Sequence, residues 1–201
     1  MLDALGKLIK EGRLGRLEVV NLAARPELAQ SLGVRSVPWI RLGEFELTGA
    51  QGLGELRQWA GFAASGGGGA AYLSHLLEQR QLDRVVERAR GSVQAMTDLL
   101  RLLADEQTPM AVRIGVGAAI EDLAGEMRLA EAVPELIELT QSDRPQTRAD
   151  ACHYLALSGD PRVIPTLERL LDDADQEVRE IAREGLAALA GMKLEESLAS
   201  I

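Results

Sequence analysis

The 201-residue chain has few aromatic residues and few of the residues that commonly carry catalysis or bind metals. Phe, Trp and Tyr together make up 3% of the sequence, and there are two histidines and one cysteine. A core with so few rings is typical of closely packed helices and disfavours an all-β sandwich. The single thiol, Cys152, excludes an intrachain disulfide, so we expect a cytoplasmic protein.

Long apolar runs are also lacking. The longest uncharged stretch, between Arg57 and Glu78, contains four consecutive glycines, which would pack poorly in a bilayer. Lys7 and Lys10 interrupt the apolar residues that follow Met1. These features predict that the chain has no membrane partner and no secretory signal.

Positive charge is scarce in the second part of the chain. Up to Ala64 the sequence has 8 basic and 7 acidic residues, whereas 14 basic and 24 acidic residues follow. The whole chain therefore carries a formal net charge of −9. Such a field repels phosphate backbones, so we expect no nucleic-acid partner.

A glycine-rich stretch divides the sequence. Ser65 is followed by four glycines, which have high backbone entropy and no side chain to pack. We therefore predict a linker at 63–71, between a first domain at 1–62 and a helical domain at 72–191. Residues 192–201 are expected to form a tail, either a loose helix or a frayed end, because Gly191 is a residue that commonly ends a helix.

Residues 72 to 190 repeat a helical pattern. Their apolar positions recur at spacings of three and four. Val133-Pro134 returns 31 residues later as Ile164-Pro165, and Thr147-Arg148 returns at the same offset as Val178-Arg179. Proline in the first turn of a helix costs no hydrogen bond. We expect antiparallel helical pairs that stack into a solenoid with a groove on one side.

The repeated pattern resembles HEAT repeats, particularly the short HEAT-like units associated with phycobilisome lyases. Matching features are the Gly159-Asp160-Pro161 turn, the acidic run Asp172–Asp175 and an arginine that recurs at 113, 148 and 179. The resemblance implies an all-α, HEAT-like solenoid that holds a protein partner in its groove. Bilin attachment, as in a lyase-like protein, is a minor alternative that the same resemblance suggests.

The first domain has a different pattern. β-type runs occur at Leu17–Leu22, Trp39–Leu42 and Glu44–Leu47, and helical segments separate them. The predicted order is helix, strand, helix, strand, strand, helix. The first helix is expected at Met1–Lys10 and the last at Leu53–Trp59.

Part of this domain resembles the thioredoxin fold. The resemblance lies in Val19–Leu22, Pro26–Ala29 and Gly33–Pro38, which are similar to the stretch from the third strand of that fold to its cis-proline loop. It implies a mixed fold class, in which an incomplete α/β thioredoxin-like domain precedes the solenoid. It also implies a cis Val37–Pro38 bond and a peptide-binding loop that consists of Ser36, Val37, Pro38 and Trp39.

The chain departs from that family at its start. Met1–Lys10 is expected to be the remainder of the helix that, in thioredoxin-like proteins, follows a central strand and a Cys-x-x-Cys motif. The sequence contains neither of these. Two functions therefore stay open. One is a protein-interaction scaffold that is redox-inactive as given. The other is a thiol-disulfide oxidoreductase whose Cys-x-x-Cys lies upstream of a truncated or mis-assigned start, with the repeats binding client proteins.

The sequence predicts no catalytic, cofactor-binding or metal-binding residues. Cys152 and His153 are adjacent on a predicted helix, so their side chains point about 100° apart. Asp150 and His153 alone do not complete a tetrahedral metal site. The glycine run lacks the Gly-Lys-Ser/Thr ending of a phosphate-binding loop. The oligomeric state is left open.

Overall fold

A computed structural model describes the backbone of residues 1–199 and the side chains of residues 1–191. This part of the chain is mostly helical, and its strands form one sheet of two strands. The chain divides into two compact units, Met1–Gly68 and Gly69–Ile201. Within the described residues, every helix is too short or too polar to cross a membrane.

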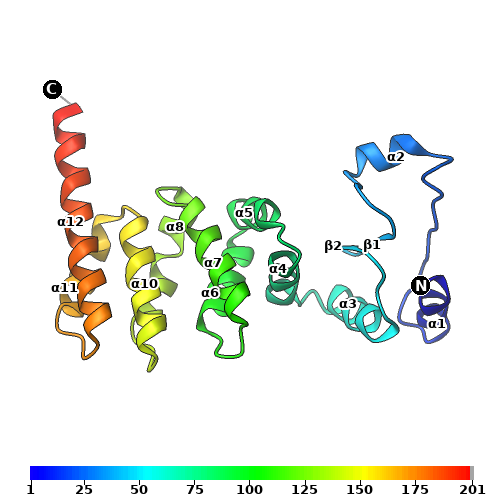
Figure 1. The fold of residues 1–201 in the computed structure, drawn as a ribbon, viewed down its shortest axis with the longest axis horizontal. Helices are drawn as coiled ribbons and strands as arrows, with labels where there is room; N and C mark the ends of the chain where they lie inside the picture. Colours follow the sequence, from blue (N-terminus) through cyan, green and yellow to red (C-terminus); the bar gives the residue numbers. More distant parts are fainter. Residues whose placement is uncertain (200–201) are drawn as a thin grey trace. The chain divides into compact units, whose positions relative to one another are not determined.

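Unit 1 contains three helices and one hairpin (Figure 1). The helices are α1 (Leu2–Lys10), α2 (Pro26–Ser31) and α3 (Leu53–Ser65), and the strands are β1 (Trp39–Leu42) and β2 (Phe45–Thr48). The strands pair antiparallel, with Trp39 opposite Thr48 and Leu42 opposite Phe45. The hairpin and the helices therefore follow the predicted order closely, and β2 begins one residue after the predicted strand.

The core of unit 1 lies where α1 and α3 meet the hairpin. Leu8, Leu47 and Leu56 are fully buried. The ring centroids of Phe45 and Trp59 are 5.2 Å apart, a separation typical of packed aromatic pairs. Three of the chain's few aromatic rings, with Phe62 as the third, therefore gather in one cluster that joins β2 to α3.

The strand predicted at Leu17–Leu22 is not present. Residues 16–20 run without regular secondary structure between α1 and α2 (Figure 1). The apolar pattern of this segment is that of a strand, but strand pairing needs a neighbour that supplies main-chain hydrogen bonds. Among the described residues no strand pairs with this segment. The prediction was therefore wrong for this element.

The linker is shorter than predicted. Helix α3 continues to Ser65, and helix α4 (Gly69–Glu78) begins at the last of the four glycines, so only residues 66–68 separate the helices. Gly69 is in close contact with the buried side chain of Asp98, because a Cβ built on Gly69 would lie 2.0 Å from Asp98 Oδ2. One glycine of the run is thus required by packing as well as by chain flexibility.

Unit 2 consists of helices that pack in sequence order (Figure 1). After α4 these are α5 (Leu82–Gly91), α6 (Val93–Ala104), α7 (Met110–Asp122), α8 (Met127–Glu131), α9 (Val133–Leu139), α10 (Pro145–Leu157), α11 (Ile164–Leu170) and α12 (Gln176–Ala199), with a 3-10 turn at Pro161–Val163. Helices α9 and α11 have proline in their first turn, as the repeat predicted.

Small residues allow the repeat helices to approach closely. Helix α10 packs against α7, α9 and α12, and Ala151 and Leu155 are fully buried. A Cβ built on Gly185 of α12 would lie 2.9 Å from the Cβ of Ala156. Real Cβ atoms do not approach this closely, so glycine is required where α12 crosses α10.

Helix α12 does not end at Gly191, where the sequence suggested a stop, because its backbone continues to Ala199. Interior glycine lowers helix stability by only about 1 kcal/mol, and good helix formers such as Met192, Lys193 and Leu194 follow it. Most of the predicted tail at 192–201 is therefore helical, and residues 200–201 lie outside the described residues.

Candidate functional site

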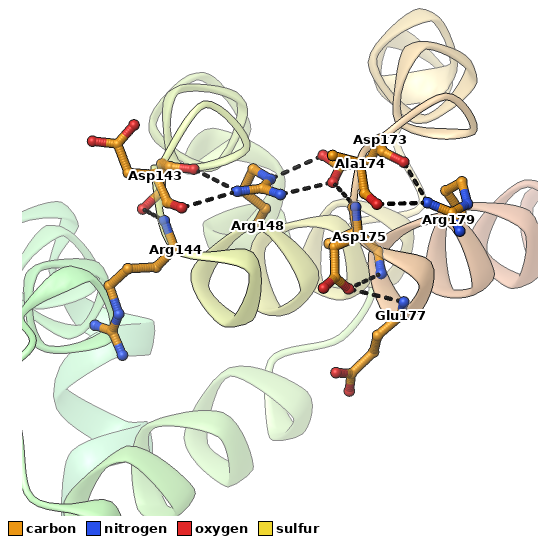
Figure 2. A network of polar contacts seen from close by, with 10 residues as sticks. Asp143, Arg144, Arg148, Asp173, Ala174, Asp175, Glu177 and Arg179 are labelled. Atoms are coloured by element: carbon orange, nitrogen blue, oxygen red, sulfur yellow. Dashed lines mark hydrogen bonds and ion pairs between the residues drawn. The ribbon is translucent and has the colours of Figure 1, made fainter.

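The recurring arginines bind the turn that precedes their own helix (Figure 2). Arg148 Nη1 donates to the carbonyl oxygens of Ser142 and Asp143, at 2.9 and 3.3 Å. Arg179 Nη1 makes the corresponding bonds to the carbonyls of Asp173 and Ala174, at 2.6 and 2.9 Å. Since unpaired carbonyls after a helix end are costly, each arginine satisfies two of them at once.

The first repeat uses a similar arrangement over a turn of the same length, since five residues separate α6 from α7, α9 from α10 and α11 from α12. Arg113 donates to the carbonyls of Leu103 and Asp105, ten and eight residues before it. Arg148 and Arg179 reach back six and five residues. Arg113 thus reaches further back than the other two, to a carbonyl in the last turn of α6. The three arginines therefore have a structural role in these turns.

A carboxylate from the next repeat completes the hydrogen-bond network of Arg148. Arg148 binds Asp173 with two bonds, Nε to Oδ2 at 2.9 Å and Nη2 to Oδ1 at 2.7 Å. The two side chains are only 14% and 10% exposed. The hydrogen bonds from Arg148 lower the pKa of Asp173. This ion pair links α10 to the turn after α11, so it fixes the stacking of neighbouring repeats.

The lowered pKa of Asp173 predicts a loss of stability in acid. A carboxyl group with a depressed folded-state pKa contributes stability above its unfolded pKa of about 3.9, and loses it as the pH falls through the folded value. Asp173→Asn should therefore destabilise the protein at neutral pH and much less at the acid end of this window. Urea unfolding at several pH values measures this difference. An equal effect of the substitution at every pH would contradict the assignment.

The predicted peptide-binding loop lies between α2 and β1. The Val37–Pro38 peptide bond is cis, which is the form that the family resemblance implied. Ser36 and Val37 are exposed, and Pro38 and Trp39 are half-buried. The carbonyl of Pro38 accepts a hydrogen bond from Gly49 N at 2.8 Å, which ties the loop to the end of β2. Peptide binding by these residues stays a prediction.

The loop borders an apolar hollow of unit 1 with a volume of about 940 Å³. Val37, Pro38 and Trp39 line it, together with β1, the segment at 16–23 and leucines of α1 and α2. The guanidinium of Arg41 lies 5.9 Å from the ring centroid of Trp39, so one face of this ring already has a cation partner. The hollow was not predicted from the sequence. Leu17–Leu22 was expected to pair as a strand, and instead it lines the hollow without pairing.

Cys152 is a buried packing residue. It is fully buried in α10, and burial is the main cause that raises the pKa of its thiol to about 12. A thiol that stays protonated at neutral pH is a poor nucleophile. Among the described residues, no group of three or more His, Cys, Asp and Glu side chains could hold a metal ion.

Cys152 should therefore react with a thiol reagent only when the protein unfolds. We expect no colour with 5,5′-dithiobis(2-nitrobenzoic acid) under native conditions, and one thiol per chain in denaturant. The Cys152→Ser variant gives the background. Stoichiometric labelling of a protein that keeps its native circular dichroism would show that the thiol is accessible.

One face of α7 is exposed and partly apolar. Met110 is 70% and Ile114 is 67% exposed, and their spacing of four places them on the same side of the helix. Glu121 has a 57% exposed side chain on this side, where it lies 3.5 Å from Nε2 of His153. Val112 and Val116 are buried on the opposite side. We call Met110, Ile114 and Glu121 the α7 face.

Sequence reasoning missed the α7 face. Apolar residues occur all around α7, so periodicity alone does not separate those that pack from those that are exposed. A usable signal was present in Met110 and Ile114, which lie outside the stripe formed by Val112 and Val116.

Residues 97–187 match the family of HEAT repeats. The match begins within α6 and ends within α12, so it includes the arginine network. The HEAT-like part of the fold prediction is thereby confirmed, and HEAT repeats are generally protein-interaction scaffolds. The comparison with curated proteins gave no match. The thioredoxin-like interpretation of unit 1 stays a prediction.

Proposed function

We propose that the chain is a protein-interaction scaffold whose repeat unit binds a basic protein partner through the α7 face. The observation that carries this proposal is the exposed pair Met110 and Ile114 on a HEAT-repeat surface. Large apolar side chains exposed on adjacent turns of a helix are typical of contact surfaces for other proteins.

Charge specifies the kind of partner. From Ser65 onward the sequence has 14 basic and 24 acidic residues, which gives this part a formal charge of −10. Some of these acids are used internally, as Asp173 is by Arg148. The excess still attracts a positively charged surface and speeds its encounter with the repeats. An apolar contact surrounded by basic residues is therefore the expected complement.

A substitution on the α7 face tests the proposal. The partner would be captured from cells with the full chain, identified by mass spectrometry and purified. Ile114→Asp should then weaken its binding by about tenfold or more, because an apolar anchor is lost at the centre of the contact. The fold should be unchanged because the side chain is exposed.

Val19→Asp is the matched control, since Val19 is 62% exposed but lies in unit 1. It should leave binding of the purified partner unchanged. If Ile114→Asp binds as well as the unsubstituted chain, the α7 face is not the contact. A partner that binds more strongly as salt is added would contradict the charge argument.

A second candidate function is the thiol-disulfide oxidoreductase. The resemblance of Val19–Leu22, Pro26–Ala29 and Gly33–Pro38 to the thioredoxin fold favours it, because in that family this loop lies next to the redox-active cysteines. The one cysteine of the given sequence is buried in α10 and has a raised pKa, so the chemistry would need cysteines outside these 201 residues. The N-terminal sequence and thiol count of the protein isolated from its own cells would test this alternative.

A further inference from the structure

The sulfur-containing side chains differ widely in exposure. Met110 is 70% and Met127 is 74% exposed, Met1 is 40% exposed, and Met96 is only 2% exposed. The thiol of Cys152 is fully buried, and burial raises its pKa, so it is neither accessible nor ionised at neutral pH. Among the described side chains, a small oxidant in solution therefore meets Met110 and Met127 first.

Met110 belongs to the α7 face, whereas Met127 does not. Met110 is the first residue of α7, one turn before Ile114 on the same side of the helix. Met127 is the first residue of α8, which follows the other end of α7 and packs against α6 and α9. The chain thus has two methionines of similar exposure, of which one contributes an apolar side chain to the proposed contact.

Exposure also determines what oxidation of each methionine changes. Most of the Met110 side chain already contacts solvent, so an oxygen atom added to its sulfur displaces no packed neighbour. Oxidation of Met96, by contrast, would place a polar sulfoxide in the core of unit 2, because this side chain is buried on α6. A change at Met110 alone is therefore expected to alter binding and to leave the free energy of unfolding unchanged.

We propose that oxidation of Met110 to its sulfoxide releases the basic partner from the α7 face, and that reduction restores binding. This inference rests on the proposed function, since the α7 face must be the contact for Met110 to control it. A hydroperoxide supplies the oxygen atom. Its O–O bond breaks and an S–O bond forms, so that the thioether sulfur loses two electrons and the peroxide is reduced to water or an alcohol.

The sulfoxide is polar at a position where the contact needs an apolar side chain. In the complex its oxygen would have to leave water, and burial of a polar group without a hydrogen bond is costly. Ile114 keeps its own apolar contact, so binding should weaken by about tenfold or more without being abolished. A dithiol reverses the reaction, because the sulfoxide oxygen leaves as water and the two thiols become a disulfide.

Graded oxidation of the full chain tests the chemical part of the proposal. The chain would be treated with hydrogen peroxide, the excess removed with catalase, and the sulfoxide at each methionine measured by peptide mass spectrometry. Met110 and Met127 should oxidise about tenfold or more faster than Met96, and the circular dichroism should stay native while Met96 is unmodified. Equal rates for Met110 and Met96 would overturn the proposal.

Binding of the purified partner is then measured with the oxidised chain. The affinity should fall by about tenfold or more in step with the sulfoxide at Met110, and should recover after treatment with methionine sulfoxide reductases and dithiothreitol. Met110→Leu keeps an apolar side chain and removes the thioether, so it should bind equally well before and after peroxide. Met127→Leu is the matched control and should lose binding on oxidation as the unsubstituted chain does.

The result for Ile114→Asp separates this proposal from the proposed function. If Ile114→Asp weakens binding and oxidation of Met110 does not, the α7 face is the contact and the oxidation proposal is wrong. If both changes leave binding intact, the α7 face is not the contact, and oxidation control of it is wrong as well. Peroxide that weakens binding of Met110→Leu as strongly as that of the unsubstituted chain would assign the effect to another residue and overturn the proposal.

Discussion

Arg148→Ala should lower the free energy of unfolding by about 3–5 kcal/mol, the loss typical of a buried ion pair that is broken on one side. Arg148 makes two hydrogen bonds to Asp173 and two to main-chain carbonyls (Figure 2). The Asp173 side chain is only 10% exposed in the intact pair, and removal of Arg148 leaves its carboxylate without this cation. The carbonyls of Ser142 and Asp143 lose the same donor.

Chemical denaturation of the full chain measures this effect. Arg183→Ala is the matched control, since Arg183 is an exposed arginine of α12, and it should change stability by less than about 0.5 kcal/mol. Arg148→Lys should recover only part of the loss, because an ammonium group cannot make the two-point contact with Asp173. Equal stability of Arg148→Ala and Arg183→Ala would show that the network contributes nothing to repeat stacking.

Gly185→Ala should destabilise the repeat unit by about 1–3 kcal/mol, although alanine is the better helix former. The new Cβ would lie 2.9 Å from the Cβ of Ala156, and neither methyl group can rotate away. The crossing of α10 and α12 would have to widen. Gly191→Ala lies on the same helix, where an added Cβ meets nothing within 4 Å, and should instead stabilise by about 0.5–1 kcal/mol.

A second substitution tests whether the loss of stability comes from the contact between positions 185 and 156. Ala156→Gly removes the methyl group that faces Gly185, so the double variant Gly185→Ala with Ala156→Gly should recover part of the loss. The thermal midpoints of the four proteins give the coupling between the two sites. Additive effects of the two substitutions, or a Gly185→Ala protein as stable as Gly191→Ala, would contradict the close crossing.

The repeat unit could be predicted well because its signals are local and recur. The prolines of α9 and α11 are 31 residues apart, as are Arg148 and Arg179, and Arg113 precedes Arg148 by 35 residues. A repeated pattern gives each element several independent indications. The end of α12 was predicted too early, because a single glycine does not end a helix when good helix formers follow it.

Unit 1 was harder to predict because strand formation depends on a neighbour. Leu17–Leu22 has the composition of a strand, yet pairing is decided by what lies beside it. The hairpin was predictable since Gly43, which has a positive φ of 59°, provides its turn locally. The hollow depends on side-chain exposure, which a sequence pattern does not report, whereas the α7 face had a sequence signal in the position of Met110 and Ile114 outside the stripe of Val112 and Val116.

The central claim is that the repeat unit binds a basic partner at the α7 face, and crosslinking tests it most directly. A photoreactive amino acid would be placed at position 114 of the full chain, and at position 19 in a parallel sample. We expect a covalent adduct from position 114, joined to a basic segment of one protein, and its absence from position 19. Adducts of that protein at position 19 alone, or none at position 114, would contradict the claim.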